Sequence, residues 1–260
     1  MKIKQKKFNK KNVKWMNAVP PLILLILILT SWEIYVAVSG ISARILPAPH
    51  VIFGKLGSKF MRDLFPDFIY SIKVILSGYC ISIPCGILLA AICSQSKYIT
   101  KAITPVLIIL VVIPMLTLVP ILQLWYGYVM KVRIIVVICQ AVPIICLNTL
   151  RGFTKVEVAK RELFRSLGAT RFQTFIKLIF PNALPQVFVG LKLGCIFSTI
   201  AAMGADLAAS NEGLGSRISV YSGMLMTDMA YGTIIVVALI GIVLFSIVAR
   251  LEKKVVVWIK

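Results

Sequence analysis

Six long apolar runs constrain this chain more than any other feature of its sequence. They cover residues 18–39, 69–93, 102–122, 132–150, 184–207 and 230–249. The hydrocarbon core of a bilayer, about 30 Å thick, is spanned by roughly 20 apolar residues in an α-helix. Of the 260 residues, 59% are apolar and only 15% are charged, whereas soluble domains carry about 25% charged residues. The sequence therefore predicts an all-α membrane protein with six transmembrane helices and excludes a water-soluble enzyme.

Basic residues are distributed unevenly between these runs. Seven lysines precede the first run, and the segment 151–183 between the fourth and fifth runs carries seven Lys and Arg residues. Lys and Arg concentrate in cytoplasmic loops, so both termini and this segment are predicted to be cytoplasmic. The resulting division is a basic N-terminal segment (1–17), a transmembrane domain (18–250) and a basic tail (251–260). Because a nucleic-acid-binding domain gathers its basic residues on one folded polar face, no nucleic-acid partner is expected.

The sequence offers few groups for catalysis or metal binding. Its six cysteines, all within apolar runs and without a Cys-x-x-Cys pair, are predicted to be small buried hydrophobic residues; they are Cys80, Cys85, Cys93, Cys139, Cys146 and Cys195. The single histidine, His50, cannot build a metal site alone. No phosphate-binding loop of the Gly-x-x-x-x-Gly-Lys-Ser/Thr type occurs. We therefore expect no metal, no cofactor and no enzymatic activity in this chain.

The cytoplasmic segment between the fourth and fifth runs has the pattern of two short helices. Thr154 and Glu157 have the spacing of a capping box, and Thr170 and Gln173 form a second one. Gly168 is placed to end the first helix in the left-handed conformation. The ion pairs expected on the first helix are Glu157–Arg161 and Glu162–Arg165, and its apolar stripe consists of Val156, Ala159, Leu163 and Leu167. Two interpretations fit this pattern: a helix that docks into a groove of a soluble partner, and a hairpin on the membrane surface.

The same segment resembles the "EAA" loop of ABC-importer permeases, whose pattern is Glu-Ala-Ala, three residues, Gly, nine residues and Ile-x-Leu-Pro. Glu162 lies six residues before Gly168, and Pro181 lies thirteen residues after it. Leu163 and Phe164 depart from the pattern, since they replace Ala-Ala. The resemblance implies that the segment is a coupling loop that contacts an ATPase subunit through Glu162, Leu163, Phe164, Arg165, Leu167, Gly168, Ala169 and Pro181.

Shorter similarities extend from about Ile45 to Glu252 and point to the branch that imports nitrate, sulfonate, taurine and related solutes. They are Leu46-Pro47-Ala48-Pro49, Pro114 and Pro120 before Trp125-Tyr126-Gly127, Leu147-Asn148-Thr149, and Gly213-Leu214-Gly215. The resemblance implies a permease homodimer in the bacterial plasma membrane. It also implies two ATPase subunits that bind ATP and Mg, and an extracytoplasmic binding protein that delivers the solute.

Candidates for the translocation path are the polar or adaptable residues of helices three to five: Met115, Asn148, Ser198 and Asp206. For Met115, Asn148 and Ser198, helix packing or a satisfied hydrogen bond between helices is the simpler explanation. Residues 48–64 have the pattern of an interfacial helix, and the loop 208–229 is expected to receive the binding protein. The alternative function is an ion-coupled secondary carrier, which would need an internal repeat and ionisable residues at mid-membrane depth.

Overall fold

The computed structural model describes residues 10–209 and 212–258, and no β-strand occurs in these two ranges. The first half of the chain forms α1 (Lys10–Ser39), α2 (Pro49–Lys59), the π-helical turn η1 (Phe60–Leu64), α3 (Phe65–Cys93), α4 (Lys97–Val112), the 3₁₀ turn η2 (Met115–Leu118) and α5 (Val119–Tyr126). The second half forms α6 (Met130–Thr154), α7 (Val158–Ser166), α8 (Arg171–Thr174), the π-helical turn η3 (Phe175–Ile179), α9 (Phe180–Ala209), α10 (Leu214–Gly223) and α11 (Thr227–Val255). The predicted N-terminal segment lies in part outside the described residues, as do the last two residues of the tail.

Helices long and apolar enough to cross a membrane confirm the predicted fold class. There are five of them in the described chain, or six when the bent pair of α4 with η2 and α5 is counted as one span. The second and fifth spans are longer than predicted, because α2 and η1 lead directly into α3 and because α8 and η3 lead directly into α9. Residues 48–64, expected to be an interfacial helix, therefore continue into a membrane helix.

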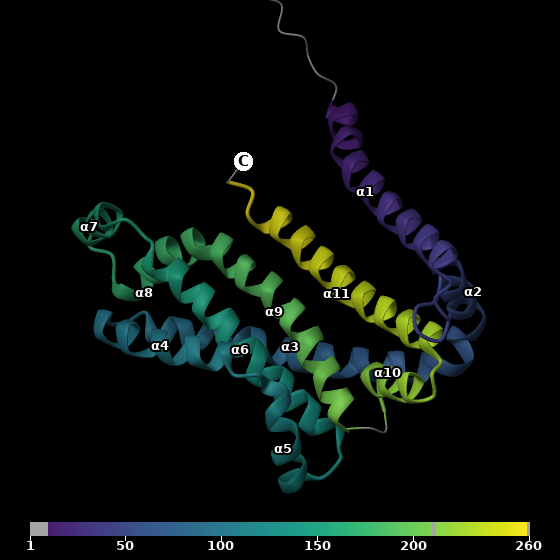
Figure 1. Cartoon of the computed structure of the whole chain (residues 1–260). Helices are drawn as coiled ribbons and strands as arrows, with labels where there is room; N and C mark the ends of the chain where they lie inside the picture. The colour runs from purple at the N-terminus through teal and green to yellow at the C-terminus, as the bar shows by residue number, and fades with distance from the viewer. Residues whose placement is uncertain (1–9, 210–211, 259–260) are drawn as a thin grey trace, which may run out of the picture.

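The third span is bent rather than continuous, by 78° between α4 and the η2–α5 segment. Pro114 disfavours the helical conformation of the residue before it, and Ile113 has an extended ψ of 123°. Pro120 then lies in the first turn of α5, where its missing N–H group costs no hydrogen bond. Figure 1 shows α5 turning away from the direction of α4.

The centre of the bundle is α6, which packs between α3 and α9 (Figure 1). Close approach of the three helices depends on glycines that face Ile145 of α6. A Cβ atom on Gly86 of α3 would lie 2.8 Å from the Cβ of Ile145, and one on Gly194 of α9 would lie 2.8 Å from its Cγ1. Small residues at helix contacts are the usual means by which membrane helices reach van der Waals packing.

The cysteines divide into three groups, and Cys139 alone is half-buried. Cys93, Cys146 and Cys195 are buried as predicted, but the prediction is wrong for Cys80 and Cys85, which are exposed on the surface of the single chain. Apolar periodicity within a membrane span does not tell the surface of a helix from its core, because lipid and protein interior are both apolar solvents.

The first helix lies apart from the bundle along one side of the molecule (Figure 1). None of the apolar window in Val19–Ser39 is buried within the chain. Its contacts are made near its C-terminal end, where the rings of Trp32 and Tyr231 lie 5.8 Å apart and Glu33 Oε1 lies 2.5 Å from His50 Nδ1.

Candidate functional site: the loop between α6 and α9 and the outer cluster

Gly168 ends α7 in the left-handed conformation that the sequence predicts, with a φ of +74°. The amide of Ala169 donates to the carbonyl of Phe164 at 3.0 Å, and the amide of Gly168 donates to that of Arg165 at 3.0 Å. This pair of bonds is the Schellman motif, which satisfies the last carbonyls of a helix. No atom lies within 4 Å of the position that a Cβ on Gly168 would take, so glycine is required there by the backbone conformation alone.

Of the two predicted capping boxes, the second is present. The amide of Gln173 donates to Thr170 Oγ1 at 3.2 Å, and the Gln173 side chain accepts from the amide of Thr170 at 2.9 Å. The first box is wrong: Thr154 is the last residue of α6, and its hydroxyl donates to the carbonyl of Leu150 at 3.0 Å. Glu157 is itself the N-cap residue of α7, and its side chain makes no capping hydrogen bond. The helix of the fourth span, α6, extends four residues beyond the predicted end at residue 150. It therefore includes Thr154, which cannot cap α7.

The predicted ion pairing on α7 also differs. Glu157 pairs with Lys160 at 3.1 Å rather than with Arg161. The guanidinium of Arg161 instead donates through Nη2 to the backbone carbonyl of Phe153 at 2.8 Å. Since Phe153 lies in the last turn of α6, Arg161 joins α7 to the end of the central helix.

An exposed apolar strip lies on α7 and α8, and we call it the coupling face: Leu163, Leu167 and Phe172, with exposed fractions of 57%, 74% and 71%. Phe164, the other bulky departure from Ala-Ala, is half-buried, and so are Ala169 and Pro181. The exposed charged residues around the strip are mainly basic: Lys160, Glu162, Arg165, Arg171 and Lys177. Exposed apolar side chains on a short helix, with a charged rim, have the chemistry of a contact surface for another protein.

The four candidates for the translocation path are all buried within the single chain. Met115 packs into the apolar core, and Asn148 donates to the carbonyl of Ile144 in its own helix at 2.8 Å. Ser198 has no hydrogen-bond partner among the described residues. Asp206 is different, because it forms an ion pair with another helix. Across the described chain, no hydrogen bond or ion pair joins any two of these four residues.

Asp206 belongs to a buried polar group that we call the outer cluster: Asp67 and Ser71 of α3, Arg133 of α6, Asp206 of α9 and Arg217 of α10. Ser71 Oγ donates to Asp206 Oδ2 at 2.9 Å, and Arg133 Nε lies 3.1 Å from Asp206 Oδ1 as an ion pair. Arg217 Nε donates to Asp67 Oδ2 at 2.5 Å. The side chains of Asp206, Arg133 and Asp67 are only 1%, 2% and 6% exposed, whereas that of Arg217 is 40% exposed. The cluster therefore balances two carboxylates against two guanidinium groups, and three of these four charged groups lie away from solvent.

The backbone after α9 is drawn into the same cluster. Asp67 Oδ1 accepts a hydrogen bond from the amide of Gly213 at 2.8 Å. Gly213 has a φ of +94°, and a Cβ atom there would overlap the carboxylate of Asp206. Arg133 also donates to the hydroxyl of Tyr70 and, at 3.5 Å, to the carbonyl of Glu212. Sequence reasoning had singled out Asp206 but had missed Asp67, Ser71 and Arg133, whose signal is that each polar side chain lies next to or within an apolar run.

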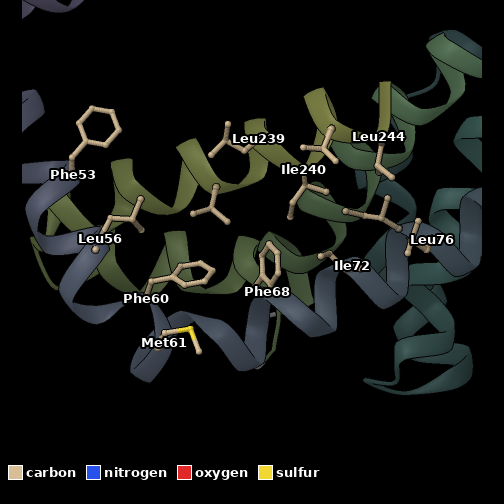
Figure 2. Close-up of a pocket in the computed structure, with 14 residues that line it drawn as sticks. Phe53, Leu56, Phe60, Met61, Phe68, Ile72, Leu76, Leu239, Ile240 and Leu244 are labelled. Atoms are coloured by element: carbon tan, nitrogen blue, oxygen red, sulfur yellow. The ribbon is translucent and has the colours of Figure 1, made fainter. Parts of the chain in front are cut away.

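Two apolar grooves lie between α11 and its neighbours. The first, of about 690 Å³, separates α11 from α2, η1 and α3, and Figure 2 shows Leu56, Phe60, Phe68, Ile240 and Leu244 around it. The second, of about 820 Å³, lies between α9 and α11. Neither lining contains a charged side chain, so both grooves offer van der Waals contact rather than ion coordination.

Comparison with known proteins agrees with this architecture. Residues 82–257 match the family described as "Binding-protein-dependent transport system inner membrane component". The chain belongs to this family. It is 28% identical to the formylaminopyrimidine transport permease protein ThiX of Halalkalibacterium halodurans, over 94% of this chain and 97% of that protein. It is 26% identical to the putative aliphatic sulfonates transport permease protein SsuC of Bacillus subtilis, over 98% and 91% of the two chains.

Further relatives support the branch that the sequence had indicated. The taurine transport system permease protein TauC of Escherichia coli is 25% identical over 90% of this chain and 87% of its own length. Among solved structures, a chain of the inward-facing MetNI methionine ABC transporter has the same fold, with a TM-score of 0.59 and 18% identity over 77% of this chain and 98% of that chain. This chain is a permease subunit of an ABC importer for a small solute and a multi-pass inner-membrane protein. The family works with ATPase and binding-protein subunits, and the alternative of an ion-coupled carrier finds no support.

Proposed function

We propose that two copies of this chain form the translocation path of the importer and that each copy contacts one ATPase subunit through the coupling face. The observation that carries the proposal is the exposure of Leu163, Leu167 and Phe172 on a loop that is otherwise tied to the bundle. ATP and Mg bind to the separate ATPase subunits, because this chain has no phosphate-binding loop. The permease itself catalyses no reaction.

Coupling in this proposal requires a contact whose strength differs between two states. A bound nucleotide shifts a conformational equilibrium only through such a difference. Closure of the two ATPase subunits would move α7, and the bond from Arg161 to the carbonyl of Phe153 would pass the movement to α6. Glu162, Arg165 and Ala169 belong to the same contact. Met115, Asn148, Ser198 and Asp206 remain our candidates for the path.

The proposed solutes are of the nitrate, sulfonate and taurine class. Relatives named as permeases for aliphatic sulfonates, taurine and nitrate align over about nine-tenths of this chain. A binding protein on the extracytoplasmic side would deliver the solute and supply most of the specificity. The excess of Lys and Arg around the predicted cytoplasmic segments supports a bacterial plasma-membrane orientation with both termini in the cytoplasm.

The test is a pull-down of the tagged chain from its native cells in mild detergent, with mass spectrometry of the proteins that co-purify. The wild-type chain should retain a P-loop ATPase in equal amount. The double variant Leu163→Ser/Leu167→Ser should lose most of it, because the apolar contact is removed while the fold is not. Met224→Ser truncates an exposed apolar side chain of the α10–α11 turn and should retain the ATPase.

Two outcomes would overturn the proposal. One is recovery of the wild-type chain without any ATPase. The other is an equal loss of the ATPase from the Met224→Ser control, which would mean that the loss does not depend on the coupling face in particular.

A further inference from the structure

The N-terminus of α10 is held by side chains of another helix. Its own capping residue, Gly213, provides no side chain. Instead, the amide of Gly213 donates to Asp67 Oδ1 at 2.8 Å, and the amide of Leu214 donates to Ser71 Oγ at 2.9 Å. Asp67 and Ser71 are four residues apart on α3 and so lie on one face of that helix. Two orphan amides of α10 are thus satisfied by α3.

The same two side chains extend the connection to α6 and α9. Ser71 donates to Asp206 of α9 while it accepts from α10, and Asp206 pairs with Arg133 of α6. A second link runs from Arg217 of α10 to Asp67. Each carboxylate therefore has a guanidinium partner. Removal of Arg217 would leave the buried Asp67 without its partner, and removal of either Arg133 or Asp206 would leave a buried charge uncompensated.

We propose that Asp67 and Arg133 are positioning residues that keep α10 attached to α3, α6 and α9 in every state of the transport cycle. The proposal rests on the proposed function, because it concerns how this permease moves when its ATPase subunits bind nucleotide. α10 is then a rigid extension of the α6–α9 pair. Movement at the extracytoplasmic surface of α10 reaches the cytoplasmic loop without an intervening hinge.

The attachment of α10 matters because α10 and the segment that carries α7 and α8 lie at opposite ends of α9. Figure 1 shows α10 at one end of α9 and α7 near the other end, with α6 and α9 leading into the segment that carries α7 and α8. A binding protein that presses on α10 would therefore act on the two helices that flank the cytoplasmic loop. A loosely attached α10 would absorb the same displacement.

Accessibility of a single side chain of α10 tests the attachment. Ser216 is buried, with 3% of its surface exposed, whereas Ser219 on the same helix is exposed. The variants Ser216→Cys and Ser219→Cys are prepared as complexes with the ATPase in lipid nanodiscs. Each is treated with a charged, membrane-impermeant maleimide, and the labelling of the wild-type chain with its six free cysteines is subtracted.

The labelling is measured without nucleotide and after trapping with ATP and vanadate. We expect Ser219→Cys to react quickly in both states and Ser216→Cys to react slowly in both, with rates that differ less than about twofold. A tenfold faster reaction of Ser216→Cys in either state would show that α10 separates from the cluster and would overturn the proposal.

Removal of one positioning residue completes the test. Arg133→Gln in the Ser216→Cys background should raise the labelling rate at least tenfold. Arg133→Lys, which keeps the charge, should restore part of the protection. The matched control is Arg62→Gln, because Arg62 is 92% exposed and its one ion pair among the described residues is with the neighbouring Asp63 at 3.8 Å. An unchanged rate in Arg133→Gln would overturn the role of Arg133.

Failure of this inference is distinguishable from failure of the proposed function. If no ATPase co-purifies with the wild-type chain, the proposed function fails, and vanadate trapping is impossible. Labelling of Ser216→Cys in the permease alone, with and without Arg133→Gln, still reports on the attachment of α10.

Discussion

The loop between α6 and α9 and the outer cluster fix the two ends of these two helices by opposite means. The bonds that shape the loop join residues three to eight positions apart, such as Ala169 to Phe164 and Arg161 to Phe153. The bonds and ion pairs of the outer cluster join residues 73 to 150 positions apart. The loop exposes apolar side chains, whereas the cluster buries three of its four charged groups. The short-range bonds of the loop leave its apolar surface free to contact another protein. The long-range bonds of the cluster pair its charged groups within the chain, so these groups are not free to bind a partner.

The largest difference between the two regions should appear when one charge is removed from each. Asp206→Ala leaves the buried Arg133 without its carboxylate partner and should lower the free energy of unfolding by about 3–5 kcal/mol. Glu157→Ala breaks an exposed pair with Lys160 and should change the stability by less than about 1 kcal/mol. Unfolding of the purified chain in detergent and SDS gives both values. Similar losses in the two variants would mean that the outer cluster is no more cohesive than a surface pair.

A comparison of two glycines with positive φ sharpens the same contrast. Gly213→Ala adds a Cβ that overlaps the carboxylate of Asp206, and Gly168→Ala adds one that meets nothing within 4 Å. Both incur the left-handed backbone cost of about 1–2 kcal/mol, but only Gly213→Ala also disrupts packing. The same SDS titration should therefore show the larger loss of stability for Gly213→Ala. The reverse order would contradict the assignment of Gly168 as a purely conformational requirement.

Activity should separate the variants of Gly168 from one another. Gly168→Val should insert into the membrane but fail to couple ATP hydrolysis to transport, since a β-branched residue resists the left-handed corner. Gly168→Asn should retain coupling, because asparagine tolerates that conformation. Uptake by cells that depend on this importer, normalised to the amount of chain in the membrane, is the measurement. Normal uptake with Gly168→Val would show that the corner is dispensable.

The smallest effect is expected from a pair that belongs to neither region. Lys192 of α9 lies 2.9 Å from Glu252 of α11, and both side chains are partly exposed. Lys192→Ala should lower the stability by no more than about 1 kcal/mol, as measured by the same unfolding titration. A loss as large as that of Asp206→Ala would show that the bundle has a second essential ion pair.

Sequence reasoning succeeded where the determinants are local. The length of the apolar runs predicted the membrane helices. The residues around Gly168 and Thr170 predicted the end of α7 and the start of α8, because helix caps depend on neighbours within a few residues. It failed at Thr154, where the continuation of α6 overrode a local capping signal. It also failed to bring Asp67, Arg133 and Asp206 together, since no short-range pattern encodes a contact between helices.

The bent third span lies between these cases. Pro114 and Pro120 were visible as breaks in the run 102–122, but the angle of 78° depends on what the segment after the break packs against. Leu116 of η2 lies against Gly204 of α9. A Cβ atom on Gly204 would lie 3.3 Å from Cδ1 of Leu116. Pro114 therefore explains why α4 ends. The small size of Gly204 explains why the segment after the break can pack closely against α9.

The isolation of α1 has a consequence for how the protein is made. Synthesis proceeds from the N-terminus, so α1 reaches the bilayer before any of the helices that it could pack against. A helix that buries none of its apolar window within the chain satisfies its backbone internally and its side chains with lipid. α1 can therefore be inserted alone. It then anchors the growing chain in the membrane while the four other later spans assemble around α6.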